Sequence, residues 1–403
     1  MSYQRIRVQR PRALISRREF LVGSGATALL TALPGFMARA ASEPLPMRHF
    51  SLRPGKASAQ LVPGKYPATP VWAYNRSVPG PEIRLTQGDR VRIAVENALD
   101  EETTVHWHGL RVPHAMDGVP HLTQTPIGPD KHFVYEFDVP DAGTYWYHPH
   151  QRSSEQVGRG LCGPLIIEER EPITVDREVT WVLDDWRLER DARISDDFAN
   201  RHDMSHNGRL GNTVTINGEI PDSFQVRQGE RIRLRVINAA NARIFALNFH
   251  GHQPQVIALD GQPVTPHEPA NRTVVLGPAM RADLVLDMTG DPDTRFTITD
   301  TFYSGLEYEL IDVVYESESL RSNALDSPIA LPANTLPEPL MAGITRHQIR
   351  FNGGMMGQMM MGGGMMGGGN NMMAMMREGK MWFINGVAAS GHVMDPLVTL
   401  ERD

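Results

Sequence analysis

The segment QGDRVRIAVEN, residues 87–97, alternates polar and apolar side chains along its length. Because successive side chains of a β-strand point to opposite faces, Val91, Ile93 and Val95 share one face of a predicted strand. The segment QGERIRLRVIN, residues 228–238, repeats this pattern 141 residues later, which is the size of one domain. The repeat therefore predicts two homologous β-domains.

Further runs of β-favouring residues surround both copies, and turn residues separate them at the spacing of a β-sandwich. Glycines and prolines number 36 and 30, which favours many short strands over a helical bundle. We expect an all-β protein with one sandwich at 46–168 and another at 172–316. The runs lie at 165–167, 179–183, 213–216, 255–259, 273–276, 284–286 and 296–298.

A Pro- and Ser-rich linker is predicted at 317–339, and a third unit follows at 340–403. The tripeptide Ile-Asn-Gly at 384–386 repeats the one at 216–218, which precedes the strand signature of the second domain. Residues 387–403 contain no copy of that signature. The third unit is thus expected to be an incomplete sandwich that leaves strand edges and apolar faces uncovered.

Charge and cysteine content exclude two classes of protein. The net charge of −7 argues against a nucleic-acid binder, whose surface is usually basic. Cys162 is the only cysteine, so the chain cannot form an intrachain disulfide.

The N-terminal segment 1–40 has the order of an export signal. Ser-Arg-Arg-Glu-Phe-Leu at 16–21 is typical of a twin-arginine signal, an apolar stretch covers 21–33, and Ala-Arg-Ala at 38–40 offers a cleavage site. The apolar stretch is shorter than the roughly 20 residues that span a bilayer. We expect export of the folded protein to the bacterial periplasm by the twin-arginine machinery, with no stable membrane span.

Two His-x-His pairs carry the clearest chemical signal, His106 with His108 and His148 with His150. Residues i and i+2 of an extended chain share a face, so each pair presents two imidazoles side by side. If the two segments are neighbours, four imidazoles converge, and such a set suits copper, zinc, iron or nickel, with copper bound most tightly. Four unrelated structural histidines are the alternative, which agrees less well with the Trp or Tyr that flanks each pair.

The other histidines and the cysteine favour structural interpretations. His250 and His252 occupy the place of the first pair in the second repeat, and we interpret them as a structural echo. His202 and His206 are predicted to lie in a solvated polar loop. Cys162 opens an apolar strand and is expected to be a buried, unreactive thiol.

A methionine-rich insert covers 355–376 and shows no amphipathic period. Thioether sulfur is a soft ligand that selects Cu(I), so the insert is a candidate copper-binding segment. The alternative is a flexible low-complexity insert without function. Its methionines are Met355, Met356, Met359, Met360, Met361, Met365, Met366, Met372, Met373, Met375 and Met376.

With these features together, the sequence resembles the bacterial three-domain multicopper oxidases of the copper-efflux and laccase-like kind. The motifs that match lie at 106–110 (HWHGL), 117–118 (DG), 143–150 (GTYWYHPH) and 160–165 (GLCGPL). The resemblance implies tandem cupredoxin-like Greek-key β-sandwiches, two complete and the third incomplete. It also implies a copper enzyme that takes electrons from Cu(I) or phenolic donors and reduces O2 to water.

The resemblance also implies roles for single residues. His106 would bind the type 2 copper, while His108, His148 and His150 would bind the type 3 pair. Asp117 would form hydrogen bonds near the type 2 copper and help to move protons; a simple turn aspartate is the alternative.

The family's remaining ligands lie in the motifs H-x-x-H-x-H and H-C-H-x-x-x-H, and neither occurs in the 403 residues. The chain therefore holds half of the type 2 and type 3 ligands and lacks the type 1 ligands. The leading hypothesis is a shortened multicopper oxidase that is inactive alone. A second is a non-enzymatic periplasmic protein that sequesters copper. A third is a copper-free cupredoxin scaffold, against which the retained histidine pairs argue.

Overall fold

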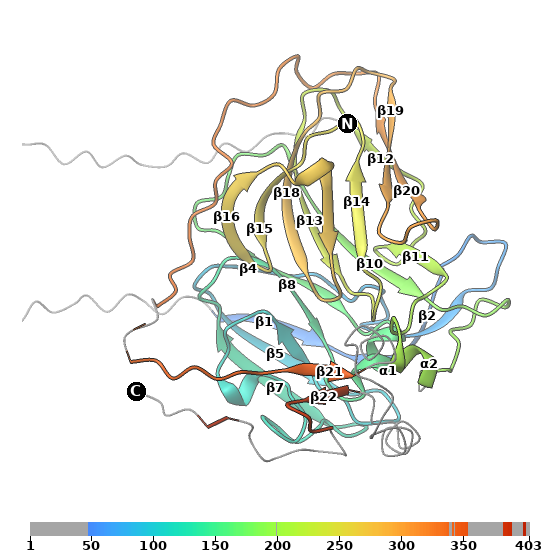
Figure 1. Ribbon diagram of the computed structural model, residues 1–403, viewed down its shortest axis with the longest axis vertical. Helices are drawn as coiled ribbons and strands as arrows, with labels where there is room; N and C mark the ends of the chain where they lie inside the picture. The colour runs from blue at the N-terminus through green and yellow to red at the C-terminus, as the bar shows by residue number, and fades with distance from the viewer. Residues whose placement is uncertain are drawn as a thin grey trace, which may run out of the picture. The chain divides into compact units, whose positions relative to one another are not determined.

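The computed structural model describes residues 47–198, 200–337, 341, 343–353, 382–388 and 398–399. The predicted export signal at 1–40 and the methionine-rich insert at 355–376 lie outside these residues. Nearly all regular structure in the described part is β-strand, with two short α-helices, α1 (Ser153–Gly158) and α2 (Arg201–Ser205) (Figure 1). Within this part, no helix is long and apolar enough to cross a membrane.

The strands between residues 47 and 168 form the first sandwich. One sheet has the order β1 (Met47–Leu52), β5 (Arg90–Glu96), β7 (His132–Asp138), and the other has the order β4 (Ile83–Thr86), β9 (Gly163–Glu168), β8 (Gly143–His148), β6 (His106–His108). β2 (Pro54–Ala59) pairs with β3 (Thr69–Tyr74). Val91, Ile93 and Val95 are fully buried between the sheets, which confirms the predicted alternation of β5.

The strands between residues 177 and 315 form the second sandwich. Its larger sheet has the order β11 (Thr213–Ile216), β10 (Arg177–Trp186), β13 (Arg231–Asn238), β18 (Arg281–Asp287), β15 (Gln255–Leu259), β16 (Gln262–His267). Its smaller sheet has the order β12 (Ser223–Val226), β20 (Tyr308–Tyr315), β19 (Arg295–Asp300), β14 (Phe245–Phe249), β17 (Thr273–Leu276). Ile232, Leu234 and Val236 of β13 belong to the core between these sheets.

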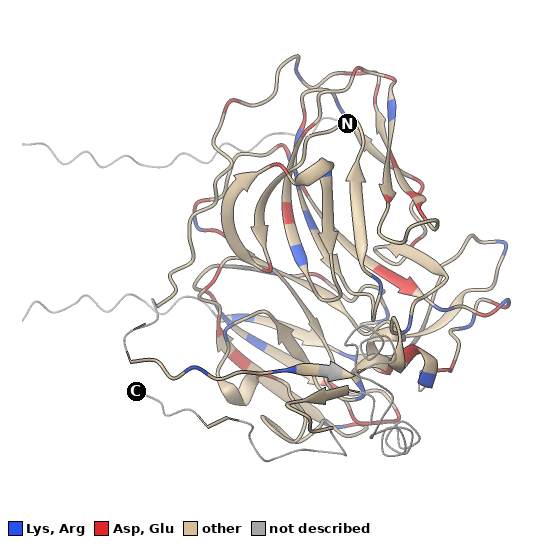
Figure 2. Ribbon diagram, in the orientation of Figure 1, with Lys and Arg blue, Asp and Glu red and all other residues tan. Residues whose placement is uncertain are grey.

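The polar face of β13 is buried, in contrast to that of β5. Arg233 and Arg235 are 1% and 0% exposed, and Figure 2 shows both signs of charge on the strands of the larger sheet. Arg233 donates to Glu169 at 2.7 and 2.8 Å, and both arginines donate to Oδ2 of Asp283 at 2.7 and 2.9 Å. Arg235 also donates to Thr144 of β8, at 2.8 Å. These arginines therefore face the first sandwich, and they pair with Asp283 of the neighbouring strand β18 and with Glu169, which follows β9.

The segment predicted as a linker contacts both sandwiches. The side chain of Asn334 accepts a hydrogen bond from the backbone N–H of Ala142 at 2.9 Å and donates to Gln262 at 3.1 Å. Arg231 of β13 donates to the carbonyl oxygens of Leu325 and Ser327. These contacts hold the segment after β20 against both sandwiches. The domain boundaries remain predictions, at 46–168, 172–316 and 317–339.

Beyond residue 340 the described structure is a two-stranded antiparallel ladder of β21 (Phe351–Gly353) and β22 (Trp382–Ile384). Phe351 and Trp382 are 75% and 56% exposed. Large apolar side chains are thus exposed in the described residues of this part, and an incomplete third unit at 340–403 stays a prediction.

Candidate metal centre

The histidine pairs meet because β6 and β8 are antiparallel neighbours. In their register His106 lies opposite His148, and His108 lies opposite Trp146. Since side chains alternate along a strand, the imidazoles share one face, while Trp107 and Tyr147 point into the core of the first sandwich. Alternation along the strands and their pairing together bring His106, His108 and His148 to one face, while His150 follows the end of β8.

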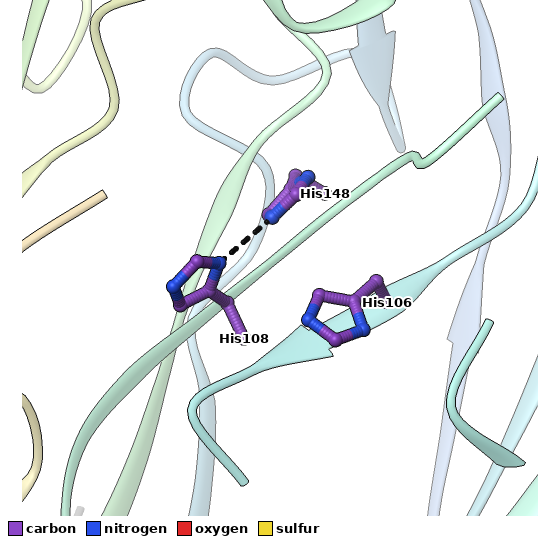
Figure 3. A group of neighbouring side chains, drawn as sticks. All are labelled: His106, His108 and His148. Atoms are coloured by element: carbon purple, nitrogen blue, oxygen red, sulfur yellow. Dashed lines mark hydrogen bonds between the residues drawn. The ribbon is translucent and has the colours of Figure 1, made fainter. Parts of the chain in front are cut away.

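Nitrogen atoms of His106, His108 and His148 all lie within 4.8 Å of one another. Figure 3 shows the three rings on their two strands, with Nδ1 of His108 facing Nε2 of His148 at 3.1 Å. The ring of His150 lies 4.6 Å from that of His106, centroid to centroid. The structure thus brings together all four histidines that the sequence analysis selected.

Hydrogen bonds to backbone carbonyls orient two of the rings. Nδ1 of His106 donates to the carbonyl oxygen of Asp117 at 2.7 Å, and Nδ1 of His148 donates to that of Pro149 at 3.0 Å. Such bonds fix the tautomer of a metal-binding histidine and leave Nε2 with a free lone pair. His108 is the exception, because its Nδ1 points toward the other rings.

Asp117 reaches His106 because a glycine follows it. A Cβ atom at Gly118 would collide with the carbonyl oxygen of Val105, and the φ of Gly118 is +76°, which favours glycine. The carboxylate of Asp117 lies 3.3 Å from Nδ1 of His106 and is about one-third exposed. Asp117 therefore offers both a backbone acceptor and a carboxylate beside this ring.

The imidazoles of His108 and His148 are held neutral by their surroundings. Burial is the largest cause that lowers the pKa of His108 to about 3, and the charges of Arg281, His106 and His150 contribute to the same shift. Burial is also the main cause that lowers the pKa of His148 well below its usual value. Neutral imidazoles keep the lone pairs that metal ions require.

Two further residues around the cluster were not predicted from the sequence. Trp146 stacks on His148, with ring centroids 4.2 Å apart. Arg281 comes from β18 of the second sandwich and donates to the carbonyl oxygen of Thr144. Its guanidinium group occupies the space that a Cβ atom at Gly109 would need. The tryptophan was visible as a flanking aromatic residue, whereas no local pattern distinguishes Arg281 from the other arginines of the chain.

The other histidines and the cysteine considered in the sequence analysis lie outside the histidine cluster. His252 is buried and both of its ring nitrogens have partners, the carbonyl oxygen of His250 and the hydroxyl of Tyr315. Its contacts support the structural interpretation. Cys162 is buried, as expected, and burial raises the pKa of its thiol well above the usual value.

The prediction that His202 and His206 lie in a loop is wrong. His202 lies within α2 and His206 is its C-cap residue. Asn200 caps this helix by accepting hydrogen bonds from two backbone N–H groups, which favours a helical turn over a loop.

The donor set of the cluster fits copper. Its ligand-capable atoms are imidazole nitrogens, and Asp117 is the nearby carboxylate. Hard cations such as Mg²⁺ and Ca²⁺ prefer oxygen ligands, whereas neutral imidazoles suit copper and bind it more tightly than the other divalent first-row ions.

These features define a class, namely all-β proteins of tandem cupredoxin-like sandwiches with a histidine cluster in the first. Residues 57–172 and residues 177–323 each match a family model described as multicopper oxidase. The chain belongs to the multicopper oxidases. The resemblance and the all-β fold expected from the sequence are thereby confirmed.

Individual relatives agree with this assignment. Copper resistance protein A of Pseudomonas syringae pv. tomato is 32% identical over 333 residues, 70% of this chain and 54% of the relative. Multicopper oxidase MmcO of Mycobacterium tuberculosis is 34% identical over 254 residues, 56% of this chain and 49% of the relative. The crystal structure of a multi-copper oxidase from Pseudomonas thermotolerans superposes with a TM-score of 0.69 at 34% identity, covering 76% of this chain and 72% of that one. The chain thus spans about half the length of the curated relatives it matches.

Proposed function

We propose that this chain binds copper through the histidine cluster and serves the oxidation of Cu(I) or phenolic donors with reduction of O2 to water. His106 would hold the type 2 copper, and His108, His148 and His150 would hold the type 3 pair. The observation that carries this proposal is the convergence of three imidazoles from two adjacent strands, with the ring of His150 beside that of His106. Membership of the multicopper oxidases supports copper as the metal.

The residues of the cluster have distinct tasks under this proposal. His106 and His148 present Nε2, because their Nδ1 atoms donate to backbone carbonyls, whereas His108 directs Nδ1 toward the same space and would bind copper through it once that nitrogen loses its proton. Bound copper supplies one-electron redox chemistry at this place. The carboxylate of Asp117 lies beside His106 and is partly exposed, so it is placed to carry protons between solvent and the site.

Copper loading tests the ligand assignment. The 403-residue chain and its His148→Ala and His250→Ala variants are loaded with Cu(II), and the bound copper is counted after gel filtration. His148→Ala should lose copper from the cluster, while His250→Ala is the control, because its exposed ring lies in the second sandwich. Equal copper content in all three proteins would contradict the assignment.

We further propose that residues 1–403 alone do not turn over. The motif that supplies the type 1 ligands in the family does not occur in this sequence, so the chain holds no entry point for electrons from the donor. Fusion of a segment with the family's H-x-x-H-x-H and H-C-H-x-x-x-H motifs should then produce O2 uptake with Cu(I) or a phenol.

Copper sequestration is the second candidate function. It is favoured by the same missing motif and by the methionines at 355–376, whose thioethers select Cu(I). A sequestering protein would take up Cu(I) without consuming O2, and the fusion described above would leave its O2 uptake at zero. The two candidate functions therefore differ in the expected rate of O2 uptake by the fusion protein.

The proposed location is the periplasm, reached by the twin-arginine machinery. The support is the order of charges and apolar residues at 1–40. Replacing Arg17 and Arg18 by lysine should leave the protein in the cytoplasm, as seen by fractionation and immunoblotting. Unchanged periplasmic protein would contradict this route.

A further inference from the structure

Arg281 of β18 brings a positive charge from the second sandwich to the edge of the histidine cluster. Its Nη2 atom occupies the space that a Cβ atom at Gly109 would fill, and Gly109 directly follows His108. The φ of Gly109 is +87°, so the backbone passes the guanidinium group in a conformation that favours glycine. The charge therefore lies beside the turn that carries His108.

Hydrogen bonds hold the guanidinium group in this place. Nε donates to the carbonyl oxygen of Thr144 at 3.2 Å, and Nη2 donates to that of Asp260 at 2.9 Å. Nη1 donates to the carbonyl oxygen of Ala279 at 3.0 Å and to Oδ1 of Asp260 at 3.3 Å. All but one of these acceptors are neutral carbonyl groups, so they fix the guanidinium group without cancelling its charge.

The carboxylate of Asp260 offsets only part of this charge. The side chain of Arg281 is 4% exposed, whereas that of Asp260 is 49% exposed. Water screens the charge of a half-exposed carboxylate more strongly than it screens a buried charge, and an arginine side chain stays protonated in proteins. The field of Arg281 at the cluster is therefore positive, in agreement with its contribution to the lowered pKa of His108.

We propose that Arg281 sets the redox preference of the copper held at His108 by stabilising Cu(I) relative to Cu(II). The reason is electrostatic, because a fixed positive charge repels a doubly charged ion more strongly than a singly charged one. The affinity of the site for Cu(I) relative to Cu(II) rises accordingly, which is equivalent to a higher reduction potential of the bound copper. This inference rests on the function proposed for the histidine cluster, and it adds a residue of the second sandwich to that site.

The ratio of Cu(I) affinity to Cu(II) affinity tests this inference, measured for the 403-residue chain by competition with chelators, without O2 for Cu(I). Only the copper equivalent that disappears in His148→Ala is counted. Arg281→Met removes the charge and keeps an extended side chain, so it should lower the ratio by at least about threefold. Arg281→Lys keeps the charge and should stay within about twofold of the wild type.

Two further variants test the sign of the effect and its dependence on place. Asp260→Asn keeps an oxygen acceptor for Arg281 and removes the opposing charge, so it should raise the ratio. Arg295→Met removes an exposed arginine of the second sandwich that pairs with Asp312, and it should leave the ratio unchanged. Circular dichroism and unfolding curves show that the variants are folded.

The outcomes separate this inference from the function on which it rests. If no copper equivalent depends on His148, both are overturned. If that equivalent is present but Arg281→Met leaves the ratio unchanged, the inference alone is overturned. The same holds if Arg281→Lys lowers the ratio as much as Arg281→Met, since the role of Arg281 is then structural, or if Asp260→Asn lowers it.

Discussion

At the scale of single residues, Gly118 determines how close Asp117 comes to His106. The loop must pass the carbonyl oxygen of Val105, and it does so with a backbone conformation that only glycine adopts without strain. The carbonyl oxygen of Asp117 that orients the ring of His106 thus depends on the glycine at position 118.

Gly118→Ala should lower the free energy of unfolding by about 1–3 kcal/mol, the usual cost of a strained backbone position. It should also weaken copper binding at His106, because Asp117 moves away from the ring. Chemical denaturation and copper titration measure the two effects. Gly64→Ala is the matched control, since a Cβ at Gly64 meets nothing within 4 Å. Equal effects of both substitutions would contradict this account.

The sequence predicts the histidine cluster but only part of its environment. The i, i+2 spacing alone places each pair on one face, and the resemblance supplies the assumption that the pairs are neighbours. The choice of nitrogen in each ring depends on hydrogen bonds to carbonyls of residues such as Asp117, which spacing does not determine. Arg281 reaches the cluster only because the second sandwich packs there.

At the scale of elements, β5 and β13 show the limit of the alternating pattern. Both have apolar residues at every second position, yet the arginines of β5 are exposed and those of β13 are buried. The pattern predicts which face of each strand enters its own core. It does not reveal that the other face of β13 packs against the first sandwich, since that depends on Glu169 and Thr144, which lie far away in the sequence.

Asp283→Asn should lower the free energy of unfolding by about 3–5 kcal/mol, because it leaves Arg233 and Arg235 buried with less opposing charge. Denaturation in urea measures the change. Asp138→Asn is the matched control, since Asp138 pairs with Arg90 on the surface of the first sandwich, where such pairs contribute about 0–1 kcal/mol. A loss below 1 kcal/mol for Asp283→Asn would show that the buried charges are not needed for stability.

At the scale of the whole molecule, Glu178 links the sandwiches by charge. Its carboxylate accepts from Arg235 at 2.9 Å and from Arg84 of β4 at 2.6 Å. Burial raises the pKa of Glu178, but the charges and hydrogen bonds of Arg235, Arg84 and Arg233 outweigh it and hold the pKa at about 2. The ionised carboxylate is therefore a stabilising group of the folded chain.

Because the pKa of Glu178 is lower in the folded protein than its usual 4.5, its stabilisation is complete above 4.5 and is lost as the pH falls toward 2. Urea denaturation at a series of pH values between 6 and 2.5 should show this decline. Glu178→Gln should be less stable at pH 6 and should lose less stability on acidification. Glu318→Gln, an exposed control, should follow the wild type. A parallel decline in Glu178→Gln would contradict the assignment.

The arrangement of the molecule into two sandwiches could be predicted from the 141-residue repeat, and several strands coincide with predicted runs, among them β11, β15 and β17. Others were missed, such as β1 and β20, because mixed polar residues such as Arg48 and Glu309 interrupt their apolar pattern. Pairing with β5 and β19 supplies the hydrogen bonds that hold these strands in place. Such tertiary partners are invisible to a local window of sequence.

The colour of the copper-loaded chain depends on whether a thiolate binds the metal. Intense blue absorption arises from a copper ion bound by a cysteine thiolate and two histidines. Cys162 is the only thiol, it is 1% exposed, and it packs with Trp146, Val182, Ile237 and Ala239. Burial raises the pKa of this thiol well above its usual value, so the thiolate that copper requires is disfavoured.

Residues 1–403 loaded with copper should therefore show no intense blue band and no O2 uptake with Cu(I) or a phenol. Visible spectroscopy and an oxygen electrode measure both, and bound copper is counted in the same samples to show that loading succeeded. Cys162→Ser should have the same spectrum as the wild type. A blue band that disappears in Cys162→Ser would instead place a copper–thiolate bond at Cys162, and the electron entry point would then lie within the first sandwich.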